Sequence, residues 1–404
     1  MNMNGNIMKT VLRLVKRTGL MQWCVASLFF IFVILPMSCE IDPPLHLPME
    51  EVEVEVPVVI QELDVVWDID VSWMQRWYYG WDATDSTLWG EISYPMPTNY
   101  EVRRYFLGDV PSVSHTEVDG FTIWEPKFRR KFNFGYYDVL VWSNIDSEDG
   151  TQVVVINESD LDNVIASTTT RATSFSNGAK FGYRHYNQPE IFYSCIERNL
   201  YISKDAADYD YYDPVENMWI KTIDATLTPL VYVYLVQVVL HNNNGRITGL
   251  SENCAVNGLA STTNVTTGYT GENDASVLFG MRLKKALNVM DGKVADVIGG
   301  KLTTYGLCGM PPYNATRGRI YSGTRADVHN TFSLNISFSN EMDSTYVYDV
   351  TDQFQEQSHG GVITLEIDVD TLTIPINTTP KSGGSGFDPD VEDYKDSVIH
   401  EISM

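Results

Sequence analysis

Segments rich in β-branched and aromatic residues follow one another along most of this chain, and they restrict it to a β-rich fold. The longest is Pro229–Leu240, twelve residues that could form a central strand buried on both faces. In the first half, no segment keeps helical periodicity beyond two turns. In the second half, roughly seven strand-like runs separated by turns such as Asn242–Gly245 predict an antiparallel β-sandwich.

Similar runs in the first half predict a second sandwich. Residues 50–56 alternate acidic and apolar side chains, as in a strand with one polar face. Tyr136–Trp142 is the strongest run and ends in a polar turn. The other strands expected in the first half are Tyr100–Leu107, Val118–Trp124 and Gln152–Ile156. Those expected in the second half, besides Pro229–Leu240, are Ala255–Val265, Ser276–Leu283, Gly300–Leu307, Thr331–Ser337, Thr345–Val350 and Val362–Val369.

The sequence therefore predicts an all-β chain with two tandem antiparallel β-sandwich domains. The length also suits two domains, each with its own core. The expected domains are residues 50–165 and 223–404, joined by a linker or extended connection at 166–222 with a short helix near Pro189–Ile196. After a Gly/Ser hinge, residues 398–404 are expected to form a terminal strand of the second domain.

The first 38 residues have the pattern of an export signal. Four basic residues precede an apolar run from Leu20 to Met37, and a small residue, Ser38, stands before Cys39. This order resembles a bacterial lipoprotein signal peptide, which is cleaved before a cysteine that then carries the lipid, palmitate included, on its sulfur. Residues 39–49 are rich in proline and are expected to form an extended tether.

Two alternatives remain for this segment. The apolar run approaches the length of a membrane-spanning helix, about 18 residues, so it could also be a retained anchor. It could also direct plain secretion. Pro36, and the switch to a proline-rich segment after Cys39, favour cleavage. All three interpretations place the rest of the chain outside the cytoplasm.

The charge balance disfavours nucleic acids as partners. Removing the four basic residues of the leader changes the formal net charge from −25 to −29. A surface this acidic repels phosphate backbones and stays soluble.

The five cysteines allow few disulfides. Cys24 belongs to the leader and Cys39 is the expected lipid site. Of the remaining three, Cys254 and Cys308 share a predicted domain and form the favoured pair, with Cys195 left over. Three separate buried thiols are the alternative.

The sequence predicts neither an enzyme nor a metal or cofactor site. The seven histidines are scattered, and no nucleophile elbow, phosphate loop or dinucleotide fingerprint is present. The acidic turn at residues 144–150 lacks the register of an EF-hand. A second acidic group, Asp205 to Asp213, is likewise interpreted as a solvated turn.

Five of the nine tryptophans lie between Trp67 and Trp89. Trp67, Trp73 and Trp77 differ by even numbers, as on one face of a strand, which favours the core of the first sandwich. Alternatively, Trp73, Trp77 and Trp81 are exposed and contact sugar rings or a protein partner.

Several segments together resemble the fimbrillin-like lipoproteins of Bacteroidales bacteria, in particular their fimbrial anchors and minor components. No single segment is specific, and their order and spacing carry the resemblance. The segments are Cys39–Pro44, Tyr136–Asn144, Ile247–Leu250, Ala255–Val265, Gly299–Gly306 and Phe387–Met404. The tryptophan-rich segment and residues 165–213 do not match, so anchor, cap and stalk roles all stay open.

The resemblance implies two transthyretin-like sandwiches and a role in fimbrial assembly or cell adhesion at the surface of the outer membrane. Partners would then be the membrane, through lipid on Cys39, and fimbrial subunits, through exchanged β-strands. The segment with Val52, Val54 and Val56 and the terminal segment 398–404 are the candidate exchanged strands. A glycan-binding surface lipoprotein is the alternative.

Overall fold

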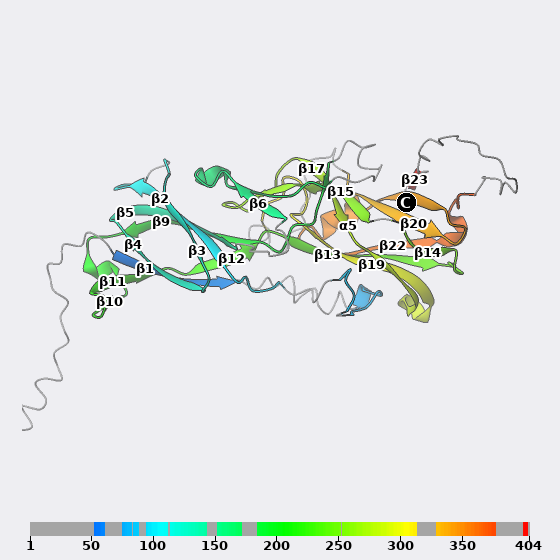
Figure 1. Cartoon of the computed structure of the whole chain (residues 1–404), viewed down its shortest axis with the longest axis horizontal. Helices are drawn as coiled ribbons and strands as arrows, with labels where there is room; N and C mark the ends of the chain where they lie inside the picture. The colour runs from blue at the N-terminus through cyan, green and yellow to red at the C-terminus, as the bar shows by residue number, and fades with distance from the viewer. Residues whose placement is uncertain are drawn as a thin grey trace, which may run out of the picture.

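The computed structural model describes residues 52–60, 75–82, 84–88, 94–111, 114–143, 152–171, 184–251, 253–312, 329–376 and 399–402, with side chains except at 52–60, 291 and 399–402. Figure 1 shows an elongated molecule with β1 to β5 and β9 to β12 at one end and β13 to β22 at the other. In this described part, no helix is long and apolar enough to cross a bilayer. The leader, the tether and Cys39 lie outside it.

At the N-terminal end, the described strands form one sheet of nine. Eight follow the order β10-β11-β1-β12-β9-β5-β2-β3, and β4 also pairs with β1. Their bounds are β1 Val52–Ile60, β2 Tyr100–Gly108, β3 Thr116–Ile123, β4 Lys127–Phe132, β5 Gly135–Ser143, β9 Tyr193–Ile202, β10 Tyr211–Asp213, β11 Met218–Thr222 and β12 Ala225–Pro229.

This sheet folds over on itself. Phe128 and Phe132 of β4 pack in one cluster with Val102 of β2 and Val139 of β5, although β4 lies several strands away from both in the sheet order. Strands so far apart in one sheet can share a core only when the two ends of the sheet face each other. The first sandwich is therefore built from a single curved sheet.

The C-terminal end has two facing sheets. One has the order β18-β19-β13-β22, and the other β23-β21-β20-β15-β17-β8, with β14 paired to β20. Their bounds are β8 His185–Tyr186, β13 Tyr232–His241, β14 Ile247–Leu250, β15 Cys254–Ala260, β17 Asp274–Phe279, β18 Arg282–Asn288, β19 Val294–Thr304, β20 Thr331–Phe338, β21 Asp343–Asp349, β22 Gly361–Asp368 and β23 Ile399–Ile402. Helix α5, Thr351–Glu356, connects the two sheets, and short 3-10 turns are η2 Leu161–Asn163, η3 Ala206–Asp208, η4 Met290–Gly292 and η5 Val369–Thr371.

Strand β13 is buried on both faces, as its composition predicted. Val236 and Val238 point into the core between the two sheets. Leu235 and Val239 pack on the opposite face, in one cluster with Trp77, Tyr79 and Leu88. A strand that is covered twice has no solvated face, which explains why its apolar residues do not alternate with polar ones.

A small fourth sheet connects the two ends of the molecule. Its order is β16-β7-β6, with β6 Val153–Ile156, β7 Ile165–Thr168 and β16 Thr262–Asn264. Beneath it, one cluster holds Trp142 from the first sandwich and Tyr305 from the second. Chain residues 230–231 lead from β12 directly into β13 and join the same cluster. The two sandwiches are therefore packed against each other.

The all-β prediction is confirmed, whereas the segment expected as a linker contains strands. Residues 193–222 form β9 to β11 of the first sandwich. The short helix expected near Pro189–Ile196 was wrong, because Tyr193 and its neighbours pair with β5 and β12 instead. Pairing across the chain outweighs a weak local helical pattern. The sheets are mainly antiparallel. The parallel pairs include β1 with β11 and β12, and β23 with β21.

The second sandwich contains a buried histidine, His359. His359 is packed against Tyr232, and its ring nitrogens lie 3.0 Å from Ser358 Oγ and 3.2 Å from the Pro311 carbonyl oxygen. Burial lowers the pKa of His359 below its ordinary value of 6.5, against the smaller opposing effect of the Pro311 carbonyl.

We expect this pKa shift to weaken the fold in mild acid. The unfolded chain takes up the proton near pH 6.5 and the folded chain only below that. His359 therefore contributes stability above pH 6.5 that is lost as the pH falls toward the folded pKa, by at most ~1.4 kcal/mol per pH unit. Urea unfolding between pH 7.5 and 5 should show a smaller loss in His359→Gln than in the wild type. Equal losses in both would contradict this assignment.

Candidate strand-exchange site

Strand β1 pairs with three other strands of the N-terminal sheet. On one side it forms six antiparallel pairs with β4, from Val52 with Phe132 to Pro57 with Lys127. On the other side it runs parallel first to β11 and then to β12. Pro57 falls between these two parallel ladders, where a missing backbone N–H does least harm.

The sheet order makes β1 the connection for three other strands. Among the described strands, β4 and the pair β10-β11 reach the rest of the sheet only through β1. Removing β1 would leave a slot bordered by the backbone edges of β4, β11 and β12. Such edges form hydrogen bonds with any strand of fitting length and register.

Strand β23 completes the other end of the molecule. Its four residues run parallel to β21, with Thr345 opposite Ile399 and Tyr348 opposite Ile402. Among the described strands, it is the outermost of its sheet. The last described strand of the chain is thus added to an edge formed by a distant segment.

The two described tryptophans of the predicted contact surface, Trp77 and Trp81, do not form a flat platform. Trp77 is 4% exposed and packs on the second sandwich, not the first, whereas Trp81 is 40% exposed. Their ring centroids are 6.0 Å apart and the ring planes are inclined by 42°. Trp67, Trp73 and Trp89 lie outside the described residues.

The segment around Trp77 is fixed to the second sandwich by polar contacts. Gln237 of β13 accepts a hydrogen bond from the Tyr78 amide at 2.9 Å. The Tyr79 ring lies over Gly299, where an added Cβ would come within 2.3 Å of it. The Tyr79 hydroxyl donates to Asp85 at 2.6 Å. Burial would raise the pKa of Asp85, but hydrogen bonds from Thr87 and Tyr79 outweigh this and lower it to about 2.

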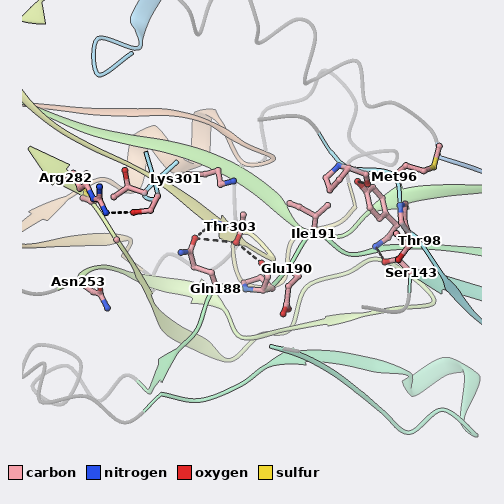
Figure 2. Close-up of a pocket in the computed structure, with 18 residues that line it drawn as sticks. Met96, Thr98, Ser143, Gln188, Glu190, Ile191, Asn253, Arg282, Lys301 and Thr303 are labelled. Atoms are coloured by element: carbon pink, nitrogen blue, oxygen red, sulfur yellow. Dashed lines mark hydrogen bonds between the residues drawn. The ribbon is translucent and has the colours of Figure 1, made fainter. Parts of the chain in front are cut away.

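A cavity of about 800 Å³ lies between the sandwiches. Figure 2 shows Lys301 and Arg282 at one end and Met96 and Thr98 at the other. Burial lowers the pKa of Lys301. Glu190 accepts hydrogen bonds from the amides of Gln152 and Val153 at 2.7 and 3.0 Å.

The side chains of this cavity mainly hold strands in place. Gln188 accepts a hydrogen bond from the Thr303 amide at 2.8 Å, and the Thr303 hydroxyl donates to the Pro189 carbonyl at 2.7 Å. Among the described lining residues, Glu190 is the one carboxylate. These residues therefore do not assemble the pair of carboxylates that glycoside hydrolysis uses.

Cys254 and Cys308 are not joined by a disulfide. Cys254 lies in the core between the two C-terminal sheets and Cys308 in the cluster between the sandwiches. The predicted disulfide between Cys254 and Cys308 was therefore wrong. The two cysteines belong to the same predicted domain, but their side chains lie in different clusters. Burial raises the pKa of Cys254 and of Cys195 to about 12, so both thiols stay protonated.

The acidic turn from Asp205 to Asp213 uses its carboxylates for local contacts. Asp205 accepts from the Ala207 amide, Asp210 from the Thr222 amide, and Asp213 pairs with Arg129 at 3.0 Å. Within the described ranges, no group of three or more His, Cys, Asp or Glu side chains is placed to hold a metal ion. The acidic turn at 144–150 lies outside those ranges.

Sequence reasoning did not single out Gln188, Glu190, Gln353 or Gln357. Gln188 and Glu190 bind backbone groups of segments that are distant in the sequence. Gln353 and Gln357 bind backbone groups of β22, which follows them after a turn. Polar residues beside strands are common, so composition and spacing give no signal for them.

Comparison with known proteins gives structural neighbours only. No family model and no curated protein matches the chain. A candidate adhesin from Bacteroides ovatus is 14% identical, with a TM-score of 0.42 over 80% of this chain and 93% of the other. The fimbrial anchor protein Mfa2 from Porphyromonas gingivalis is 13% identical, with a TM-score of 0.36 over 78% and 90%. The tip fimbrial protein Mfa3 from the same organism is 9% identical, with a TM-score of 0.32 over 74% and 81%.

These neighbours are of the kind that the sequence resemblance predicted, namely adhesin candidates and fimbrial anchor and tip proteins. The architecture of this chain is given by its own strands and cores.

Proposed function

We propose that this chain is a lipid-anchored protein of the cell surface that takes part in a fimbria, as anchor, cap or minor component, through β-strand addition. One observation carries the proposal: the first and last described strands, β1 and β23, are both held by backbone ladders in sheets made by other parts of the chain. Such strands can be exchanged between chains without redesign of the sheet that receives them.

Backbone pairing would supply affinity in this mechanism, and the alternating side chains would supply register. The alternation of residues 50–56 supports this, because a shift by one residue would turn the apolar side chains to the wrong face. Lipid on Cys39 would hold the chain in the outer membrane. A single acyl chain binds reversibly, whereas two or three give a stable anchor. The proline-rich residues 39–49 would keep the sandwiches clear of the bilayer.

Removal of residues 398–404 tests the proposal in cells. We expect the truncated protein to remain at the membrane but to disappear from purified fimbriae, because the strand that pairs in trans is missing. Blotting of fimbriae and membranes measures both pools. The double variant Ile399→Val and Ile402→Val keeps β-branched residues and should incorporate normally. Normal incorporation of the truncated protein would exclude β23 as the exchanged strand.

The anchor is tested separately by Cys39→Ala. Protease treatment of intact cells should degrade the wild-type protein, and the variant should be lost from the membrane fraction. A wild-type protein that is membrane-bound yet protected from protease would face the periplasm and contradict the surface location.

A further inference from the structure

Helix α5 lies beside the open edge of β22. The chain passes from β21 through α5 and returns as β22, so the helix crosses from one sheet to the other. β22 is the outermost strand of its sheet among the described strands, with β13 on its inner side. An exposed edge of this kind offers unpaired N–H and C=O groups to other chains.

Two glutamines occupy these groups. Gln357 accepts from the Val362 amide at 2.9 Å and donates to the Val362 carbonyl at 3.0 Å. Gln353 forms the same two bonds with Thr364, at 2.9 and 3.0 Å. Each side-chain amide thus stands where a peptide group of a neighbouring strand would stand.

The spacing explains why a helix can do this. Gln353 lies in α5, and Gln357 is the residue that caps the helix, with its backbone N–H bonded to the Gln353 carbonyl. The two are four residues apart, a rise of about 6 Å along a helix. Val362 and Thr364 are two residues apart, about 6.6 Å along a strand. The two repeats match closely enough for both glutamines to bind at once, and they run in opposite directions along the chain.

Further contacts keep the helix in this position. An added Cβ at Gly361 would lie 2.2 Å from Gln357 Oε1 and 2.7 Å from its Cβ, so the glycine makes room for the glutamine. Phe354 is fully buried between the two sheets, with its ring centroid 4.6 Å from that of Tyr234.

We propose that Gln353 and Gln357 form a plug that closes the β22 edge to pairing with a second copy of this chain. The opposite edge of the same sheet is blunted differently: β18 carries a bulge between Lys284 and Leu287, with Ala286 at a φ of 57°. If strand addition operates as proposed above, release of β23 would open β21, at one edge of the facing sheet, to a strand of another chain.

The double variant Gln353→Ala, Gln357→Ala tests the plug. We expect amide hydrogen exchange at Val362 and Thr364 to rise about tenfold or more, because each amide loses its acceptor. We also expect a dimer whose fraction increases with concentration in sedimentation velocity. Gln355→Ala is the matched control, since it removes a glutamine from the same helix that has no such bonds to β22; it should behave as the wild type.

Single variants guard against a general loss of structure. Gln357→Ala should speed exchange mainly at Val362, and Gln353→Ala mainly at Thr364, while amides of β19 keep the wild-type rate. Unchanged exchange at both positions, or a double variant that stays monomeric at every concentration, would overturn the proposal. Both readouts use the purified protein alone, so such a result would leave fimbrial incorporation to its own test.

Discussion

A chain that lacks Val52–Ile60 should lose the cooperative folding of its N-terminal sandwich. β1 is the only described connection of β4 and of β10-β11 to the rest of the sheet. Without it, Phe128 and Phe132 are no longer held over the other end of the sheet, and their cluster opens. The expected loss is comparable with the whole stability of a typical domain, ~5–15 kcal/mol. Thermal unfolding followed by circular dichroism should therefore lose or broaden one transition.

The same deletion should be repaired in trans. A synthetic peptide with the sequence of residues 52–60 would find the edges of β4, β11 and β12 open, and we expect it to restore the lost transition. The matched control peptide carries Val54→Pro, because Val54 pairs with both Arg130 of β4 and Lys221 of β11. A proline there removes a backbone donor from the middle of a strand and should abolish repair. Repair by both peptides would indicate unspecific binding instead of strand exchange.

The sequence was most informative where burial alone decides the structure. The run Pro229–Leu240 is apolar on both faces of a strand, and β13 is indeed covered on both. The alternation at residues 50–56 likewise predicted a strand, and β1 forms there. Hydrophobic pattern reports burial directly, so strands with a strong pattern can be found without knowledge of their partners.

The pattern was least informative where a distant partner decides. β9 has a mixed sequence, with Cys195, Glu197 and Arg198 close together, and its pairing with β5 and β12 makes it a strand. Trp77 and Trp81 are close in sequence, but contact with β13 and β19 buries only the first. The glutamine plug is the hardest feature to predict from the sequence. Gln353 and Gln357 have this role only because β22 returns beside them after a turn.

Truncation of Phe354 to alanine should be the most destabilising single substitution in α5. The ring is 0% exposed and lies in the core between the two C-terminal sheets, against Tyr234. Loss of a buried phenylalanine ring costs ~3–5 kcal/mol, because the apolar contacts are lost and the cavity closes only in part. Urea unfolding of the C-terminal sandwich should shift by that amount. Asp352→Ala, at an exposed position of the same helix, should change stability by less than ~0.5 kcal/mol.

The same substitution connects the core to the edge of the sheet. Phe354 lies one residue after Gln353 and three before Gln357, so a helix without its anchor should hold both glutamines less firmly against β22. We expect exchange at Val362 and Thr364 to rise in Phe354→Ala well below the denaturant concentration that unfolds the sandwich, and Phe354→Leu to restore most of the protection. A loss of stability without faster local exchange would mean that the four hydrogen bonds of Gln353 and Gln357 are enough to hold α5 against β22. Phe354 would then stabilise the core without positioning the helix.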